Sequence, residues 1–217
     1  MPGRRRPPRP SHPSSPPARP PGRGGRSRPP SDPPRNHHGF HVVRDLGVVH
    51  ALVRSSGVGP GDLVLDLGAG PGALTLALAR TGARVIAVER DPRLARRLER
   101  RTADDPSVRV VEGDLRTVPL PHRPFHVVAN IPFAASTDLL RRLLAEHHRG
   151  RALAGADLLV EWGFARRLAA ESGSGRTAAR GARRFRIDVA RRVPAVAFSP
   201  PPRVDAAHLV IRPRAVR

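Results

Sequence analysis

The chain has 217 residues, of which 39% are hydrophobic, so it is long enough for one α/β domain with a sizeable core. Its 39 basic residues are all arginine and outnumber the 18 acidic residues, and the net charge of +21 indicates a polyanionic partner, nucleic acid first and an anionic membrane second. The absence of cysteine excludes a disulfide scaffold, a cysteine-zinc site and a thiol nucleophile. No apolar run is long enough for a membrane span and the N-terminus has no hydrophobic signal core, so we expect a soluble cytoplasmic protein.

Residues 1–36 differ in composition from the rest of the chain. They hold 13 of the 26 prolines and nine arginines, against a single acidic residue, Asp32. A segment with so few large apolar side chains cannot offset its conformational entropy by burial, so we predict a disordered tail at 1–36 and a folded domain at 37–217. The tail is either a solvated extension without a specific role or an electrostatic arm that strengthens binding to phosphates.

Strand and helix patterns alternate along residues 37–217. Short apolar runs predict strands at 62–67, 84–88, 108–111, 125–129, 156–160, 184–189 and 207–212. Helices are expected at 73–80, 92–102 and 164–170, and we expect Ser136 to cap a further helix that carries Leu139, Leu140, Leu143 and Leu144 on one face. This alternation predicts an α/β fold with a doubly wound, mostly parallel, Rossmann-like sheet.

Three glycines follow the first of these strands at alternate positions: Gly68, Gly70 and Gly72. Glycine lets the backbone turn tightly and approach a nucleoside at the carboxyl edge of the sheet, where such ligands bind. The spacing differs from the Gly-x-Gly-x-x-Gly of dinucleotide-binding proteins, and Pro71 removes an amide that a pyrophosphate could have used. The turn therefore predicts either a nucleoside site or only a tight strand-to-helix connection.

Acidic residues follow at the ends of the next two strands. Glu89 ends the second strand, 17 residues beyond Gly72, where a carboxylate can accept both hydrogen bonds of a ribose diol. Asp114 follows the third strand and is placed to meet an adenine amino group. Each carboxylate alone could be a solvated loop residue, but together with the glycine turn they favour a nucleoside site. This order resembles the class I methyltransferases, whose cofactor, S-adenosylmethionine (S-adenosyl-L-methionine), is a nucleoside without phosphates.

The segment Asn130-Ile131-Pro132-Phe133 follows the fourth predicted strand. It is either a proline turn with a packing aromatic or a base-binding segment, and an aromatic there is unusual in a chain with six Phe, one Trp and no Tyr. The segment resembles the Asn/Asp-Pro-Pro-aromatic signature of methyltransferases that act on the amino group of adenine. The resemblance implies that the Asn130 side-chain oxygen and a backbone carbonyl of the segment accept hydrogen bonds from the amine and localise its lone pair. Phe133 would stack on the extruded base, and no dedicated general base is required.

Two further segments narrow the resemblance. Residues 198–205, Phe-Ser-Pro-Pro-Pro-Arg-Val-Asp, resemble a segment shared by two groups of ribosomal RNA adenine-N6 methyltransferases, the Erm family and the small-subunit enzymes. Residues 164–167, Phe-Ala-Arg-Arg, are similar to a helix of the Erm proteins. Ile131 and Phe133 favour the Erm family, which methylates an unpaired adenine of 23S ribosomal RNA and confers macrolide-lincosamide-streptogramin B resistance. The alternative is a small-subunit (16S) ribosomal RNA adenine dimethyltransferase. The resemblance makes 37–217 the methyltransferase catalytic domain and implies a monomeric enzyme whose partner is 23S ribosomal RNA before full ribosome assembly, with no membrane or protein partner.

The chain departs from the family pattern at both ends. The family opens with Gln-Asn-Phe-Leu-x-Asp where residues 40–45 are Phe-His-Val-Val-Arg-Asp, so we expect cofactor contact through the backbone of His41 and Val43. The resemblance then implies seven cofactor-binding residues: His41, Val43, Gly68, Gly70, Glu89, Asp114 and Asn130. The family continues into a small helical domain that assists RNA binding, whereas this sequence ends at Arg217. We therefore expect either that the arginines compensate or that RNA affinity is reduced.

Two other clusters are open to a simpler explanation. No carboxylates repeat at metal-ligand spacing near the histidines His37, His38 and His41, so we expect no metal site. The helix predicted at 92–102 carries a dense basic face, either solvated or in contact with RNA phosphates, made of Arg96, Arg97, Arg100 and Arg101.

Two other functions stay open. One is a catalytically weak RNA-binding relative, given the changes at positions 40 and 41. The other is a small-molecule methyltransferase, against which the net charge argues.

Overall fold

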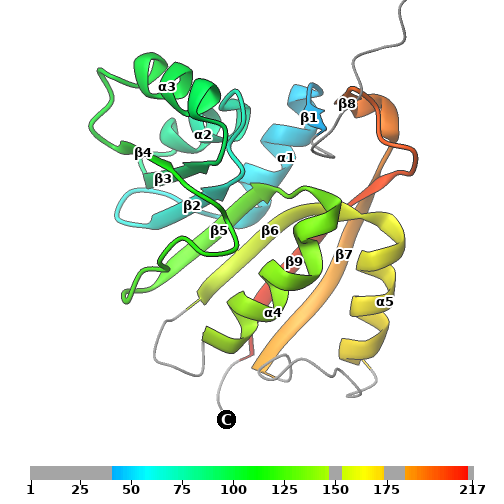
Figure 1. Ribbon diagram of the computed structural model, residues 1–217. Helices are drawn as coiled ribbons and strands as arrows, with labels where there is room; N and C mark the ends of the chain where they lie inside the picture. Colours follow the sequence, from blue (N-terminus) through cyan, green and yellow to red (C-terminus); the bar gives the residue numbers. More distant parts are fainter. Residues whose placement is uncertain (1–40, 147–152, 174–183, 215–217) are drawn as a thin grey trace, which may run out of the picture. The chain divides into compact units, whose positions relative to one another are not determined.

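The computed structural model describes residues 41–146, 153–173 and 184–214, which form a sheet of seven strands with helices on both faces (Figure 1). The predicted tail at 1–36 lies outside the described residues, as do His37, His38 and Phe40. The strands lie side by side in the order β4-β3-β2-β5-β6-β9-β7. Their bounds are β2 Leu63–Leu67, β3 Arg84–Glu89, β4 Val108–Glu112, β5 Phe125–Asn130, β6 Leu153–Glu161, β7 Phe185–Val193 and β9 Ala206–Pro213.

Neighbouring strands of this sheet are parallel except at β9, which is antiparallel to both β6 and β7. The prediction of an α/β fold with a mostly parallel sheet is therefore confirmed. All five residues of β2 are buried, because helices cover both faces of the sheet at its centre. The parallel strands β2 to β5 all end at the same edge, and this edge carries the glycine turn and the segment that begins at Asn130.

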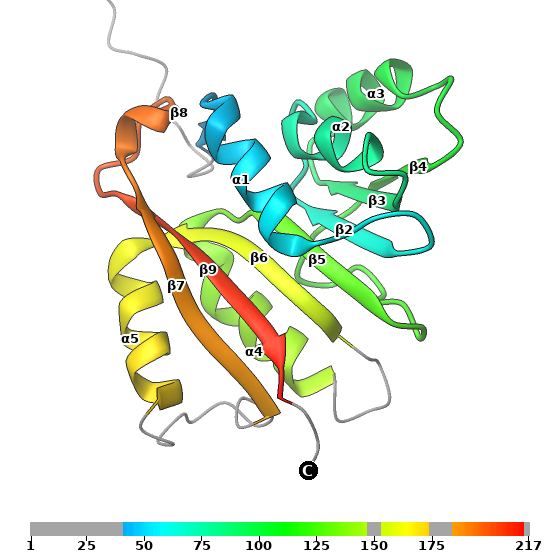
Figure 2. The ribbon, with the colours of Figure 1, turned by 180° about the vertical axis from the view of Figure 1, so that it is seen from behind.

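Five helices cover the two faces of the sheet in the described part of the chain. Their bounds are α1 Leu46–Ser56, α2 Ala73–Ala79, α3 Pro92–Arg101, α4 Ser136–Glu146 and α5 Trp162–Gly173. Helices α4 and α5 pack on one face, and α1 and α2 pack on the other, as the two opposite views show (Figures 1 and 2). None of these helices is long and apolar enough to cross a membrane.

Helix α1 and two short strands escape prediction from the sequence. In α1 the residues Val48, Val49 and Leu52 are buried, and the Asp45 side chain caps the helix by accepting a hydrogen bond from the Gly47 amide at 2.7 Å. β-Branched residues and a glycine in its first turns obscure the helical pattern in the sequence. Strand β1 (Val42–Val43) pairs with β8 (Phe198–Ser199), and strands of two residues are too short to show a period.

The prediction that Ser136 caps the fourth helix is wrong. A 3₁₀ turn at Phe133–Ala135 leads directly into α4, and Ser136 itself has helical backbone angles, with φ −59° and ψ −44°. Its hydroxyl is buried and has no hydrogen-bond partner among the described residues. The helical path thus starts earlier than the serine, just after Pro132. The predicted apolar face is correct, because all four of its leucines are buried.

Candidate functional site

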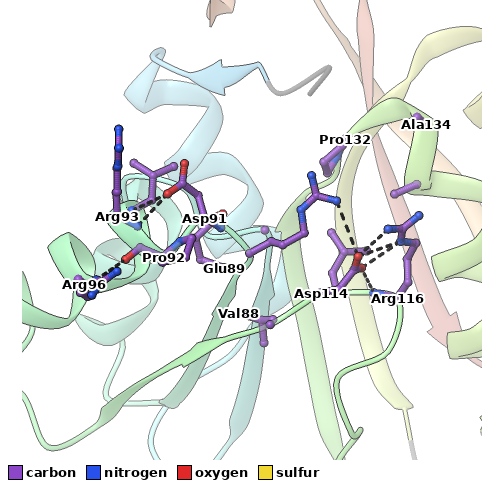
Figure 3. Close-up of a pocket in the computed structure, with 16 residues that line it drawn as sticks. Val88, Glu89, Asp91, Pro92, Arg93, Arg96, Asp114, Arg116, Pro132 and Ala134 are labelled. Carbon is purple, nitrogen blue, oxygen red and sulfur yellow. Dashed lines mark hydrogen bonds and ion pairs between the residues drawn. The ribbon is translucent and has the colours of Figure 1, made fainter. Parts of the chain in front are cut away.

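A cavity of about 600 Å³ lies at the carboxyl ends of β2 to β5, beside the first turn of α3 (Figure 3). Four of the predicted site residues line it: Gly68, Glu89, Asp114 and Pro132. A second cavity of about 20 Å³ shares Gly68 with the first and is also lined by Val43, Asp66 and Asn130. The remaining predicted residues, His41, Gly70, Ile131 and Phe133, line neither cavity but contact residues that do or lie beside them in the chain.

The glycine turn has the backbone conformation that the sequence suggests. Gly68, Gly70 and Gly72 have φ values of +84°, +55° and +90°, a region that residues with a side chain rarely adopt. A Cβ atom on Gly68 would lie 3.8 Å from both the Asn130 carbonyl oxygen and Pro132 Cδ. A Cβ atom on Gly72 would lie 2.3 Å from Leu98 Cδ1 of α3. Gly72 therefore allows the turn to approach α3, whereas Gly68 is required by its positive φ and lies at ordinary contact distance from the Asn130 segment.

Glu89 holds this turn in place. Its side chain is only 7% exposed, and Oε2 accepts a hydrogen bond from the Gly70 amide at 2.7 Å while Oε1 accepts one from the Asp91 amide at 2.8 Å. A carboxylate has lone pairs for further donors, so these two bonds are compatible with a ribose diol at the same group. The link between Glu89 and Gly70 is a structural role that sequence reasoning missed.

Asp114 forms a bidentate ion pair across the cavity from α3 (Figure 3). Arg116 Nη2 lies 2.5 Å from Asp114 Oδ2 and Arg116 Nε lies 3.0 Å from Oδ1, and Arg90 approaches to 3.9 Å. The hydrogen bonds from Arg116 lower the pKa of Asp114 to about 2, so this carboxylate stays ionised at neutral pH. An adenine amine would have to share Asp114 with Arg116.

Asn130 is held by a residue far away in the sequence. Its side chain, 9% exposed, donates from Nδ2 to the backbone carbonyl oxygen of His41 at 2.7 Å. This bond leaves Oδ1 as the side-chain atom that can accept a hydrogen bond. Ile131 is buried and donates its amide to the Leu159 carbonyl, and the ring of Phe133 lies 6.0 Å from the ring of His41.

The segment at 198–205 supports this arrangement from the other side. His41 Nδ1 lies 2.7 Å from the Pro200 carbonyl oxygen, and Val43 pairs with Phe198 in the ladder of β1 and β8. Asp205, the last residue of the segment, accepts a hydrogen bond from the Ala195 amide at 2.9 Å. The similarity between this segment and the methyltransferase motif therefore has a structural basis. The segment pairs with β1 and contacts His41, whose carbonyl oxygen accepts the hydrogen bond from Asn130.

Asp66 is a candidate site residue that sequence reasoning missed. It lies in β2 and is 1% exposed; Oδ2 accepts a hydrogen bond from Thr75 Oγ1 at 2.6 Å, whereas Oδ1 is buried and has no hydrogen-bond partner among the described residues. Burial raises the pKa of Asp66 to about 7, and the hydrogen bond from Thr75 opposes this increase. The sequence signal was available, since this acid lies two positions before Gly68.

The family described as ribosomal RNA adenine dimethylase matches residues 33–217. The chain belongs to this family. Ribosomal RNA small subunit methyltransferase A of Synechococcus sp. (strain JA-3-3Ab) is 36% identical over 192 residues, covering 83% of this chain and 68% of that protein. The mycinamicin-resistance protein MyrB of Micromonospora griseorubida is 37% identical over 180 residues, covering 83% of this chain and 56% of that protein. The chain thus spans between about half and two thirds of the length of these two relatives.

Solved structures agree with the family. The crystal structure of the 23S rRNA methyltransferase ErmE matches with a TM-score of 0.71 and 26% identity, over 80% of this chain and 70% of that one. A dimethyladenosine transferase from Plasmodium falciparum has the same TM-score of 0.71 at 24% identity and shows the shared fold. Membership of the ribosomal RNA adenine methyltransferases, the class I methyltransferase fold, the enzyme class of adenine methyltransferase and the cofactor S-adenosylmethionine are thereby confirmed. The residue assignments within the site stay predictions.

The residues of the two cavities fit this cofactor. S-adenosylmethionine carries an α-ammonium group, a ribose diol and an adenine amine, which are all hydrogen-bond donors. The buried and unpartnered Oδ1 of Asp66 lies where an ammonium would be compensated, and the carboxylates of Glu89 and Asp114 are the acceptors in the larger cavity. The hydrogen-bond donors of the cofactor are therefore matched by carboxylate acceptors in both cavities.

Proposed function

We propose that the protein transfers a methyl group from S-adenosylmethionine to the N6 amine of an unpaired adenine in 23S ribosomal RNA, and so confers resistance to macrolide, lincosamide and streptogramin B antibiotics. The observation that carries this proposal is the position of the Asn130 segment, which lies against the glycine turn with Gly68 close to both Asn130 and Pro132. An amine acceptor and a methyl-donor site thus share one edge of the sheet. MyrB, whose name denotes mycinamicin resistance, is among the relatives and supports the resistance function.

In this proposal the chain positions two reactants. Asn130 Oδ1 accepts a hydrogen bond from the adenine N6 amine, and the bond from Nδ2 to the His41 carbonyl keeps the side chain in that orientation. Asp66, Glu89 and Asp114 bind the cofactor. When bound, S-adenosylmethionine supplies an electrophilic methyl group, which bonds to N6 as its bond to sulfur breaks, and one N6 proton passes to water. The catalytic contribution of the chain is orientation and electrostatic complementarity.

The target adenine must be unstacked from its neighbours in the RNA before it can reach the segment that begins at Asn130. Phe133 is half-buried and follows Pro132, and in this proposal the exposed part of its ring stacks on the extruded base. Such stacking contributes about 1–3 kcal/mol per base. Extrusion costs least for an unpaired adenine, so the target is expected in a loop of the RNA.

A second candidate is dimethylation of adenines in 16S ribosomal RNA. It is favoured by the Synechococcus relative, which is a small-subunit methyltransferase and has 68% of its length covered by this chain. Ile131 and Phe133 favour the 23S substrate, because the resemblance to Erm proteins rests on these two positions of the segment.

One experiment separates the two candidates. The protein is incubated with radiolabelled S-adenosylmethionine and with either 23S or 16S ribosomal RNA, and the modified base is located by primer extension. We expect label in 23S RNA at one unpaired adenine. Label confined to 16S RNA selects the second candidate, and the absence of label in both RNAs leaves the catalytically weak RNA-binding relative.

A further inference from the structure

Helix α3 presents four arginines along one exposed face. We call these residues the α3 arginine stripe: Arg93, Arg96, Arg97 and Arg100. Their spacing of i, i+3, i+4 and i+7 puts them on the same side of the helix. The opposite side is buried through Ala95 and Leu98. Arg101 is not part of the stripe, because it donates from Nη1 to the Pro71 carbonyl oxygen at 2.5 Å.

The stripe has no acidic partner within the described ranges. Arg96 donates from Nε to the Pro92 carbonyl oxygen at 3.1 Å, and Glu99 on the same helix forms no ion pair. Like charges three and four residues apart repel, and a cation in the first helical turn opposes the helix dipole. These costs to helix stability are relieved by an external anion.

Two members of the stripe also border the cofactor cavity. Arg93 and Arg96 line the 600 Å³ cavity and are exposed, and Figure 3 shows them on one side of it, with Asp114 and Arg116 on the other. The stripe therefore runs from the mouth of the cavity outward along α3. An extended ligand on the stripe would therefore lie beside the cavity at Arg93 and Arg96.

The chemistry of the helix selects the kind of anion. Asp91 already accepts hydrogen bonds from the Arg93 and Leu94 amides, so the helix start offers no amide cradle for a single free phosphate. The stripe spans seven helical steps, or roughly 10 Å, which suits a run of phosphates. Its face carries no large exposed hydrophobic side chain, whereas a helix that inserts into a membrane surface needs an apolar face.

We propose that the α3 arginine stripe binds the phosphodiester backbone of the RNA substrate, and that RNA bound there slows exchange of the cofactor. Guanidinium groups pair with phosphate oxygens through two hydrogen bonds, which suits arginine better than lysine for this contact. The inference rests on the proposed function for the identity of the RNA. It adds an order of events: the cofactor enters before the RNA, and the used cofactor leaves after it.

The first test measures RNA affinity against salt for three proteins. The stripe variant carries Arg93→Gln, Arg96→Gln, Arg97→Gln and Arg100→Gln. The control carries the same charge change at exposed arginines away from the cavity, near the amino ends of the parallel strands: Arg54→Gln, Arg80→Gln, Arg84→Gln and Arg123→Gln. Four lost phosphate contacts lower the slope of log affinity against log salt by up to about 2.8 for a single strand. We expect this loss in the stripe variant and a wild-type slope in the control; equal slopes in all three proteins overturn the inference.

The second test measures cofactor exchange. Labelled S-adenosylmethionine is bound to the protein, and its release into excess unlabelled cofactor is followed with and without saturating 23S RNA. We expect RNA to slow release by about tenfold in the wild type, a usual size for coupling between two sites. The double variant Arg97→Gln and Arg100→Gln, which leaves the cavity lining unchanged, should reduce this effect, and Arg80→Gln with Arg84→Gln should keep it.

Methyl transfer is measured on the same samples, so that the two proposals fail separately. Slowed exchange without methylation of 23S RNA contradicts the proposed function and supports the stripe as an RNA contact. Methylation with a release rate that RNA does not change overturns the inference and leaves the proposed function standing. Binding to vesicles of phosphatidylserine and phosphatidylcholine is measured in parallel. The inference is also overturned if the stripe variant loses vesicle binding but keeps wild-type affinity for RNA.

Discussion

The two halves of the site are built in different ways. The cofactor half consists of consecutive strand-turn-helix units, and its central hydrogen bond joins Gly70 to Glu89, only 19 residues apart. The target-base half depends on remote segments, because Asn130 bonds to His41 across 89 residues and His41 lies against Pro200 across 159. The cofactor half can therefore form locally, whereas the target-base half needs β1, β5 and β8 to be in place. Mutations should separate the two halves.

Asn130→Ala should have the largest effect on activity and a small effect on the cofactor half. The substitution removes Oδ1, the proposed acceptor for the target amine, and the loss of one such oriented group lowers the rate by about 10²–10³-fold. Cofactor affinity, measured by calorimetry, should weaken only modestly, because the contacts of Glu89 and Asp66 are retained. Near-wild-type turnover on RNA would contradict the proposed role of Asn130.

Gly72→Ala should break the cofactor half through its packing. The new Cβ would lie 2.3 Å from Leu98 Cδ1, at a backbone φ of +90° that alanine rarely adopts. Overpacking and backbone strain together should lower the free energy of unfolding by about 3 kcal/mol, measured by urea denaturation. Gly113→Ala is the matched control, because a Cβ there would have open space and the backbone φ is not positive. Equal stability of the two variants would show that α3 moves to make room.

The same contrast explains what the sequence could predict. Gly68 and Glu89 both line the large cavity, because parallel strands joined by short turns bring their carboxyl ends to one edge whatever the rest of the chain does. Their role as cofactor-binding residues stays a prediction. The bond between Asn130 and His41 depends on the ladder of β1 and β8, and two-residue strands leave no pattern in the sequence. Asp66 was missed because it lies inside a strand pattern, although its position two residues before Gly68 was a signal in the sequence.

Asp66 sharpens the comparison through pH. Its pKa of about 7 lies above the ordinary value of 3.8, so a bound ammonium group, which favours the ionised carboxylate, must displace a proton below pH 7. Cofactor affinity should therefore rise by up to about tenfold per pH unit toward pH 7 and level off above it. Asp66→Asn should bind more weakly above pH 7 and lack this pH dependence, as measured by calorimetry across a pH series. A wild-type affinity that does not change between pH 5.5 and 8 would exclude Asp66 from the cofactor site.

The stability of the folded chain should change with pH in the opposite direction. A carboxyl whose pKa is raised by folding contributes stability below its unfolded pKa and loses it as the pH rises through the folded value. For Asp66 this window runs from about 4 to about 7. The difference in unfolding free energy between the wild type and Asp66→Asn should therefore change over this range and stay constant above it.

Asp205→Ala should have the smallest effect and should act chiefly on the target-base half. Asp205 accepts hydrogen bonds from the Ala195 amide and from Arg192 Nε, and these bonds fix the turn that leads into β8. Without them β8 holds β1 less firmly, and the His41 carbonyl orients Asn130 less well. Methyl transfer should then fall by about two- to tenfold, the range expected for one net hydrogen bond. Cofactor affinity should fall less, because β1 contributes only Val42 and Val43 to the small cavity. Asp188→Ala, which removes an exposed pair with Arg186 on the neighbouring β7, is the matched control and should keep wild-type turnover. If Asp205→Ala weakens cofactor binding as much as it lowers turnover, the two halves of the site are coupled through β1, and their separation does not hold.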